Sequence, residues 1–307
     1  MNEIYQKTIK NPISFTGVGL HSGKKTNLKI LPGNDNSGII FKRVDLKANN
    51  LIEANYKNVS STTLSTTLEN KHAVKVSTVE HLLAALYISG IDSALIEIDN
   101  EEIPIMDGSA KDFLTVLKKI DTKKLNSKIK YLKILDKIEF KDGEREINIS
   151  PKDSFEVDFE LKHENKVIGN QRNVINFNSG NLKEIEEART FCLYQDIQKI
   201  KKMGLAKGGS LENAIVVDDS KIMNKSGLRN EKEFVNHKIL DLAGDFLLSG
   251  YRILGSVFCH QGGHQLSNLF LHKLIKSKNK YKTLELETVI TKKSKDLVTN
   301  FELAARA

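Results

Sequence analysis

Three ionisable residues in the segment FVNHKILDLAGDFLLSG, residues 234–250, have types and spacing suited to metal binding. If the segment is a helix, His237, Asp241 and Asp245 recur every four residues and lie on one face. The leucines, isoleucine and phenylalanines around them would hold these groups against a hydrophobic core, where polar groups need partners. A divalent metal ion suits His and Asp together, although an exposed pair or a hydrogen-bonded core histidine fits the same spacing.

A second expected helix carries another candidate metal ligand, His81, which strengthens the case for a metal site at His237. Residues 77–90, STVEHLLAALYISG, have the apolar periodicity of a helix and place His81 beside its apolar stripe. If the two halves of the chain form domains that pack face to face, His81, His237 and Asp241 would give three ligands and leave a fourth position for water, as in catalytic zinc sites. The two cysteines are not in a CxxC motif, which excludes a Cys-rich structural zinc site.

Glu80 and His264 are candidates for proton transfer beside such an ion. Glu80 is placed either to act as a general base or to complete an S-x-x-E capping box with Ser77, and the spacing alone favours the box. His264 follows two glycines at an expected helix start, where a charged imidazole would stabilise an oxyanion or protonate a leaving amine. Asp245 is either a further carboxylate on the metal face or the group that orients His264.

Composition limits the class of protein. The 307 residues are 39% hydrophobic and 28% charged, as in soluble globular proteins, and suffice for two domains. The net charge of +8 favours anionic partners or simply solubility. The chain has no Trp, few Arg residues, and Lys residues that are dispersed along the sequence. This composition argues against a module that binds nucleic acid or an acidic glycan. No apolar run reaches the length of a transmembrane segment or signal peptide, so we expect a cytoplasmic protein.

The order of expected elements predicts an α+β fold made by duplication. Strand patterns fill residues 4–76 and 131–178, and each set is followed by a helix, a strand and a helix that starts near small residues. The polar segment 121–130 is the expected linker, and residues 183–203 have a largely helical pattern. We therefore expect two layered domains of similar topology, 1–125 and 126–307, with the active site at their interface, although chance similarity is an alternative.

Six motifs, in this order along nearly the whole chain, resemble those of the UDP-3-O-acyl-N-acetylglucosamine deacetylase family, the zinc amidases of lipid A synthesis. They are STVEHLLAAL, PIMDGSA, EEARTF, GLAKGGSLENAIVVDD, LRNEKEFVNHKILDLAGD and GGHQLSNL. The resemblance implies two α+β domains with the active site between them, in agreement with the expected duplication.

The resemblance also implies roles for residues at matching positions. The metal ligands are His81, His237 and Asp241; the general base is Glu80; the charged histidine is His264, supported by Asp245; the oxyanion hydroxyl is Thr190; the substrate-binding cation is Lys238; and the acyl-chain passage is lined by Phe191, Leu193 and Ile197. One departure is Gln261, where many family members carry Lys or Arg, so the substrate diphosphate would depend more on Lys238 or another lysine.

The implied reaction is hydrolysis of the 2-acetamido group of a UDP-linked acylated amino sugar, which yields acetate and the free amine. The cofactor would be one Zn²⁺ ion, or Fe²⁺ in the cell. We expect a monomer that binds no nucleic acid, has no transmembrane segment and contacts the membrane surface only transiently. A zinc hydrolase of another amide is the main alternative.

Overall fold

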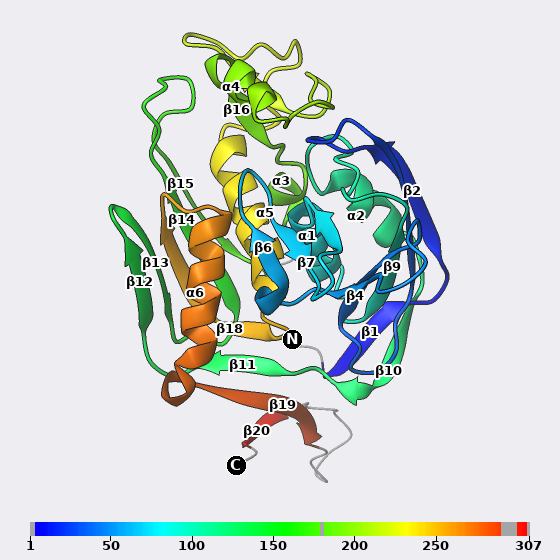
Figure 1. Ribbon diagram of the computed structural model, residues 1–307. Helices are drawn as coiled ribbons and strands as arrows, with labels where there is room; N and C mark the ends of the chain where they lie inside the picture. The colour runs from blue at the N-terminus through cyan, green and yellow to red at the C-terminus, as the bar shows by residue number, and fades with distance from the viewer. Residues whose placement is uncertain (1–3, 179–180, 290–299, 306–307) are drawn as a thin grey trace.

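The computed structural model of the protein describes residues 4–178, 181–289 and 300–305 and confirms the α+β class. In the first half of the chain a five-stranded sheet has the order β2-β3-β9-β4-β5. Its strands are β2 (Ile13–Val18), β3 (Lys25–Pro32), β4 (Ile39–Arg43), β5 (Leu51–Glu53) and β9 (Ala94–Ile98). Two helices, α1 (Glu80–Ile88) and α2 (Lys111–Leu117), lie beside this sheet (Figure 1).

Alternating burial explains why this sheet accepts helices on one face. In β3 the side chains of Thr26, Leu28 and Ile30 are buried while their neighbours face outward. On β2, Phe15 meets Phe113 of α2 edge to face, with ring centroids 5.0 Å apart. The apolar side of the sheet is thereby covered by helices.

Two smaller sheets complete this half. One contains β6 (Val59–Ser61), β7 (Thr67–Glu69) and β8 (Lys75–Ser77), and the other pairs β1 (Tyr5–Ile9) with β10 (Thr122–Lys128). The expectation of a linker at residues 121–130 is therefore wrong, because most of that segment is a strand. Its backbone bonds to β1, so its mostly exposed polar side chains need no core.

In the second half an eight-stranded sheet is built around β18 (Arg252–His260). The other strands are β11 (Tyr131–Ile134), β12 (Ile138–Asp142), β13 (Arg145–Ser150), β14 (Phe155–Leu161), β15 (Gln171–Asn176), β19 (Tyr281–Val289) and β20 (Asn300–Ala305). Helices α5 (Glu233–Leu247) and α6 (His264–Lys276) lie against it, as the sequence predicted.

The expectation of a largely helical segment at residues 183–203 is confirmed only in part, because a strand interrupts its helical pieces. The segment forms α3 (Lys183–Glu186), strand β16 (Phe191–Leu193), a 3₁₀ helix (Tyr194–Asp196) and α4 (Ile197–Lys202). Pairing of β16 with β17 (Ile215–Val217), which lies far along the chain, overrides the local helical preference.

Helices α1 and α5 pack against each other in the middle of the molecule (Figure 1). A Cβ atom built on Gly244 would lie 2.1 Å from the carbonyl oxygen of Glu80, so only glycine permits this approach. The contact places His81 opposite Asp241. Within the described residues, no helix combines the length and apolarity needed to cross a bilayer.

Candidate active site

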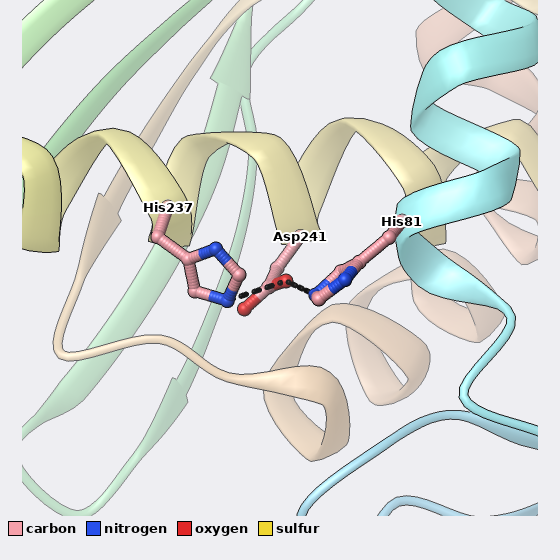
Figure 2. Close-up of side chains that lie close together, drawn as sticks. All are labelled: His81, His237 and Asp241. Carbon is pink, nitrogen blue, oxygen red and sulfur yellow. Dashed lines mark ion pairs between the residues drawn. The ribbon is translucent and has the colours of Figure 1, made fainter. Parts of the chain in front are cut away.

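The side chains of His81, His237 and Asp241 converge from α1 and α5, and Figure 2 shows them pointing toward one another. One ligand atom from each residue lies within 4.8 Å of the others. Asp241 Oδ1 is 3.5 Å from His81 Nε2 and 3.3 Å from His237 Nε2. All three residues are buried, so the group forms a compact set of nitrogen and oxygen donors that can hold a metal ion.

The hydrogen bonding of this group fits a metal ion. The buried Asp241 Oδ1 has no hydrogen-bond partner in the described part of the chain, although an orphaned buried oxygen is costly. His237 Nδ1 lies 3.0 Å from the carbonyl oxygen of Ala188 and must donate its proton there, which leaves the Nε2 lone pair free. Burial lowers the pKa of His237 to about 3, so its imidazole is neutral, as a ligand must be.

Glu80 does not form the capping box that its spacing with Ser77 suggested. Ser77 ends β8 and its hydroxyl donates to the carbonyl oxygen of Glu101, while α1 begins at Glu80 itself. The buried Glu80 carboxylate instead accepts a hydrogen bond from the backbone N–H of Thr66 (3.0 Å). Burial raises the pKa of Glu80, which increases its ability to accept and pass on a proton near neutral pH.

His264 occupies the first position of α6 and faces two carboxylates. Its Nδ1 is 2.9 Å from Asp245 Oδ2 and its Nε2 is 3.6 Å from Glu80 Oε1. Burial alone would lower the pKa of His264, but Asp245 and Glu80 outweigh it and raise the pKa to about 10. The imidazole is therefore charged at neutral pH. Asp245 bonds to His264 and lies outside the cluster of candidate metal ligands, which favours its role as the orienting group.

Thr66 joins these two parts of the site and was not recognised in the sequence. Its hydroxyl donates to Asp245 Oδ1 (2.7 Å), while its backbone N–H donates to Glu80. One threonine thus holds both the proposed base and the partner of His264.

A lysine and an arginine line the cavity beside this cluster, in addition to His264; the cavity has a volume of about 330 Å³. Lys238 Nζ is 2.8 Å from Asp241 Oδ2, and Arg145, which the sequence did not indicate, reaches the cavity from the β12–β13 hairpin. Gln261 is not among the lining residues, and its side-chain oxygen accepts a hydrogen bond from the backbone N–H of Lys162 (2.8 Å). The side chain of Gln261 therefore stabilises the backbone near Lys162 and contributes no positive charge to the cavity.

An apolar cavity of about 360 Å³ adjoins the first one and shares Leu20, Leu64, Thr190 and Phe191 with it. Ile197 lines this cavity, as expected for an acyl passage. Leu193 does not, and packs against the hydrophobic core instead. At Leu193 the chain leaves β16 for a 3₁₀ helix, so the lining continues from Tyr194, Ile197 and Ile200. His21 also faces this cavity.

A buried ion pair supports the segment that carries Thr190. Arg189 lies between Thr190 and Ala188, and its guanidinium bonds to Glu233, the first residue of α5. The backbone N–H of Thr190 donates to the carbonyl oxygen of Gly108 (2.8 Å). The segment is thus fixed from both halves of the chain.

Comparison of the sequence with known proteins identifies the family of the chain. Residues 6–276 match the family described as UDP-3-O-acyl N-acetylglycosamine deacetylase (LpxC). The chain belongs to this family. The UDP-3-O-acyl-N-acetylglucosamine deacetylase of Shewanella violacea is 41% identical over 93% of this chain and 94% of its own length. Those of Teredinibacter turnerae and Pseudomonas entomophila are each 42% identical, over 92% and 94% of this chain and 94% and 96% of their own lengths.

Membership of this deacetylase family makes the chain an enzyme, and the cluster of His81, His237 and Asp241 fits a metal-dependent one. The family resemblance drawn from the motifs is confirmed. The structure brings together every residue that the motifs assigned to metal binding or proton transfer.

Proposed function

We propose that this enzyme hydrolyses the 2-acetamido group of UDP-3-O-acyl-N-acetylglucosamine, releasing acetate and the free 2-amino sugar nucleotide in a committed step of lipid A biosynthesis. The names of the relatives support this substrate. The observation that carries the proposal is the junction of two cavities: a polar one with the His81, His237 and Asp241 cluster, and an apolar one of about 360 Å³ that has room for part of an acyl chain.

The proposed cofactor is one Zn²⁺ ion, with Fe²⁺ as an alternative in the cell. His81, His237 and Asp241 would hold it, because two imidazoles and a carboxylate suit zinc and leave a coordination position open. When bound, zinc supplies a Lewis acid that polarises the amide carbonyl and makes water a better nucleophile at neutral pH.

Glu80 takes the proton from the attacking water in the proposed mechanism. Its raised pKa fits a group that must accept a proton and release it within one turnover. The charged His264 and the hydroxyl of Thr190, which both line the cavity, donate hydrogen bonds to the oxyanion. The departing amine then receives a proton from His264 or Glu80.

The remaining substrate groups are placed by charge and polarity. The diphosphate is bound by Lys238 and Arg145, the lysine and the arginine that line the polar cavity. The acyl chain follows Phe191 and Ile197 into the apolar cavity. We further propose that the catalytic cluster lies between two domains, residues 1–125 and 126–307, in a monomer that works in the cytoplasm. Both cysteines are free thiols, which suits that compartment.

The test is acetate release from UDP-3-O-acyl-N-acetylglucosamine over a series of acyl lengths, before and after chelation, with zinc or ferrous ion restored afterwards. We expect activity to disappear on chelation, to return with metal and to fall steeply in Glu80→Ala. Activity that survives complete metal removal would contradict the mechanism. Faster hydrolysis of an unrelated amide would contradict the substrate.

A further inference from the structure

Exposed apolar side chains gather around the opening of the apolar cavity. Five of the ten exposed large apolar residues in the described part of the chain lie there, and we name this group the mouth: Val18, Leu64, Tyr194, Met203 and Leu211. Leu64, Tyr194 and Leu211 line the cavity and are still 45–54% exposed. Exposed apolar groups concentrated in this way mark a surface that is covered by something in function.

The other two members are tied to the same rim. Met203 closes α4 one turn after Ile200, which lines the cavity, and is 54% exposed. Val18 lies against the loop at residues 206–209, since a Cβ on Gly208 would lie 2.9 Å from its side chain. That loop is bonded to the backbone of Leu20 and His21.

Lysines are frequent in the segment that carries Tyr194, Met203 and Leu211 of the mouth. Residues 194–212 contain four lysines and two acidic groups, Asp196 and Glu212. The lysines are Lys199, Lys201, Lys202 and Lys207, all exposed, and none forms an ion pair with another described residue. Figure 1 shows α4 at one end of the molecule and β19 at the other.

We propose that the mouth docks on the surface of a bilayer that contains anionic phospholipid. Apolar side chains inserted at the headgroup level, combined with lysines drawn to anionic lipid, give the two signals that a reversible membrane contact needs. The contact places the opening of the apolar cavity at the level of the acyl chains. The inference rests on the proposed function only in assigning that cavity to the acyl group of the substrate.

A membrane fits these observations better than a protein partner. Three of the five apolar side chains of the mouth line a cavity, whereas stable protein interfaces have a closely packed apolar centre. Unpaired lysines at the rim gain from diffuse negative charge without needing individually placed carboxylates. We therefore commit to the lipid surface, and association with a second copy or another protein is an outcome that would count against it.

The first experiment is co-sedimentation of the full-length, metal-loaded enzyme with vesicles of phosphatidylcholine, with or without phosphatidylglycerol. We expect binding only to the anionic vesicles, weakened by salt. The Lys199→Glu/Lys202→Glu variant should bind about tenfold more weakly or worse. The matched control is Lys276→Glu/Lys278→Glu, an equal charge change on exposed residues at the far end of α6, which should bind as the unaltered protein does.

A second experiment locates the contact. The chain contains no Trp, so a Met203→Trp variant carries a single reporter at the mouth. We expect its fluorescence to shift to the blue with anionic vesicles and to be quenched by brominated lipid. A Leu135→Trp variant, exposed and away from the mouth, should show neither change.

Each outcome decides the question. Equal binding to neutral vesicles, an unquenched reporter in the Met203→Trp variant, or equal losses in both lysine double variants would overturn the proposal. Concentration-dependent dimers that disappear in Met203→Gln would assign the mouth to a second copy. Vesicle binding is measured without turnover, so a failure here leaves acetate release from a short-chain substrate intact, whereas failure of the proposed function abolishes that release.

Discussion

Arg189 and Glu233 form a buried ion pair that links the candidate metal site to Thr190, the proposed oxyanion donor. Arg189 Nε is 2.8 Å from Glu233 Oε1, and the two side chains are 5% and 0% exposed. The same carboxylate accepts from the backbone N–H groups of Arg189 and Arg229. Arg189 lies between Thr190 and Ala188, whose carbonyl oxygen bonds to His237. The Glu233 carboxylate, by holding Arg189, therefore fixes the backbone that carries Thr190 and the backbone that orients His237.

We expect Glu233→Gln to lower the free energy of unfolding by about 3 kcal/mol, because it leaves the buried guanidinium of Arg189 without its counter-charge. Metal affinity should fall by about tenfold or more, since the carbonyl of Ala188 would no longer hold His237 firmly. Chemical denaturation and competition with a chelator measure the two effects.

The matched control is Asp158→Asn, which breaks an exposed pair with Arg172. It should cost no more than about 1 kcal/mol and leave metal affinity unchanged. If Glu233→Gln behaved the same way, the buried pair would have no special role.

Glu80→Gln should reduce kcat by about a hundredfold or more while the metal content stays the same. The amide has nearly the same shape and still accepts the hydrogen bond from Thr66, but it takes up no proton. Acetate release and metal analysis on the same sample test this. A large loss of metal would indicate that Glu80 contributes to metal binding.

Asp245→Asn should lower the pKa of His264, because the Asp245 carboxylate is the largest contribution that raises it. The alkaline limb of the kcat/KM profile should move to lower pH, since the proposed mechanism uses the charged imidazole. A titration of His264 by NMR in the metal-free protein follows the same change. Glu160→Gln, which alters another His–carboxylate pair at 2.9 Å, should leave the pKa of His264 unchanged.

The same pair predicts how stability depends on pH. The folded-state pKa of about 10 is above the ordinary value of 6.5. The pairing therefore stabilises the fold fully below about pH 6.5, and this stabilisation is lost as the pH rises through about 10. The alkaline loss of stability should be smaller in Asp245→Asn than in the unaltered protein, as denaturation at a series of pH values will show.

Metal removal should lower the melting temperature, because the ion binds only the folded cluster. A free concentration of 100 times Kd corresponds to about 2.7 kcal/mol of stabilisation. Calorimetry with and without a chelator measures the shift. In His237→Ala the melting temperature should no longer respond to added zinc, and a full response there would refute this ligand.

Arg145→Gln and Lys238→Met should both raise KM by about tenfold, because each removes a cation proposed to bind the diphosphate. They should differ in a second respect. Lys238 also bonds to Asp241, so only its loss should change metal affinity. Unchanged substrate affinity in both variants would place the diphosphate elsewhere.

Much of the site could be predicted from the sequence because its residues stand on strongly periodic helices. The spacing of His237 and Asp241 on α5 and the position of His81 on α1 follow from local pattern. The α+β class follows from the alternation of strand and helix patterns. The family motifs then linked segments that the spacing alone left ambiguous.

The features that the sequence did not predict are those determined by contacts between residues far apart in the chain. Thr66 is one of several threonines in a polar run, and only the packing of that run against α1 and α5 gives it a role. Strand β16 forms because β17 lies beside it, and β10 forms because β1 does. Glu80 fits the capping pattern, but tertiary packing directs its side chain into the site.

Gly244 has a consequence for how this enzyme tolerates change. It touches no reacting group, yet a single added methyl would press on the backbone of Glu80 and push α1 away from α5. The two imidazoles would then move apart, although neither had been altered. We therefore expect sensitivity to inactivation to extend beyond the proposed substrate-contacting residues, because Gly244, which has no reactive side chain, sets the spacing between the candidate metal ligands of α1 and α5.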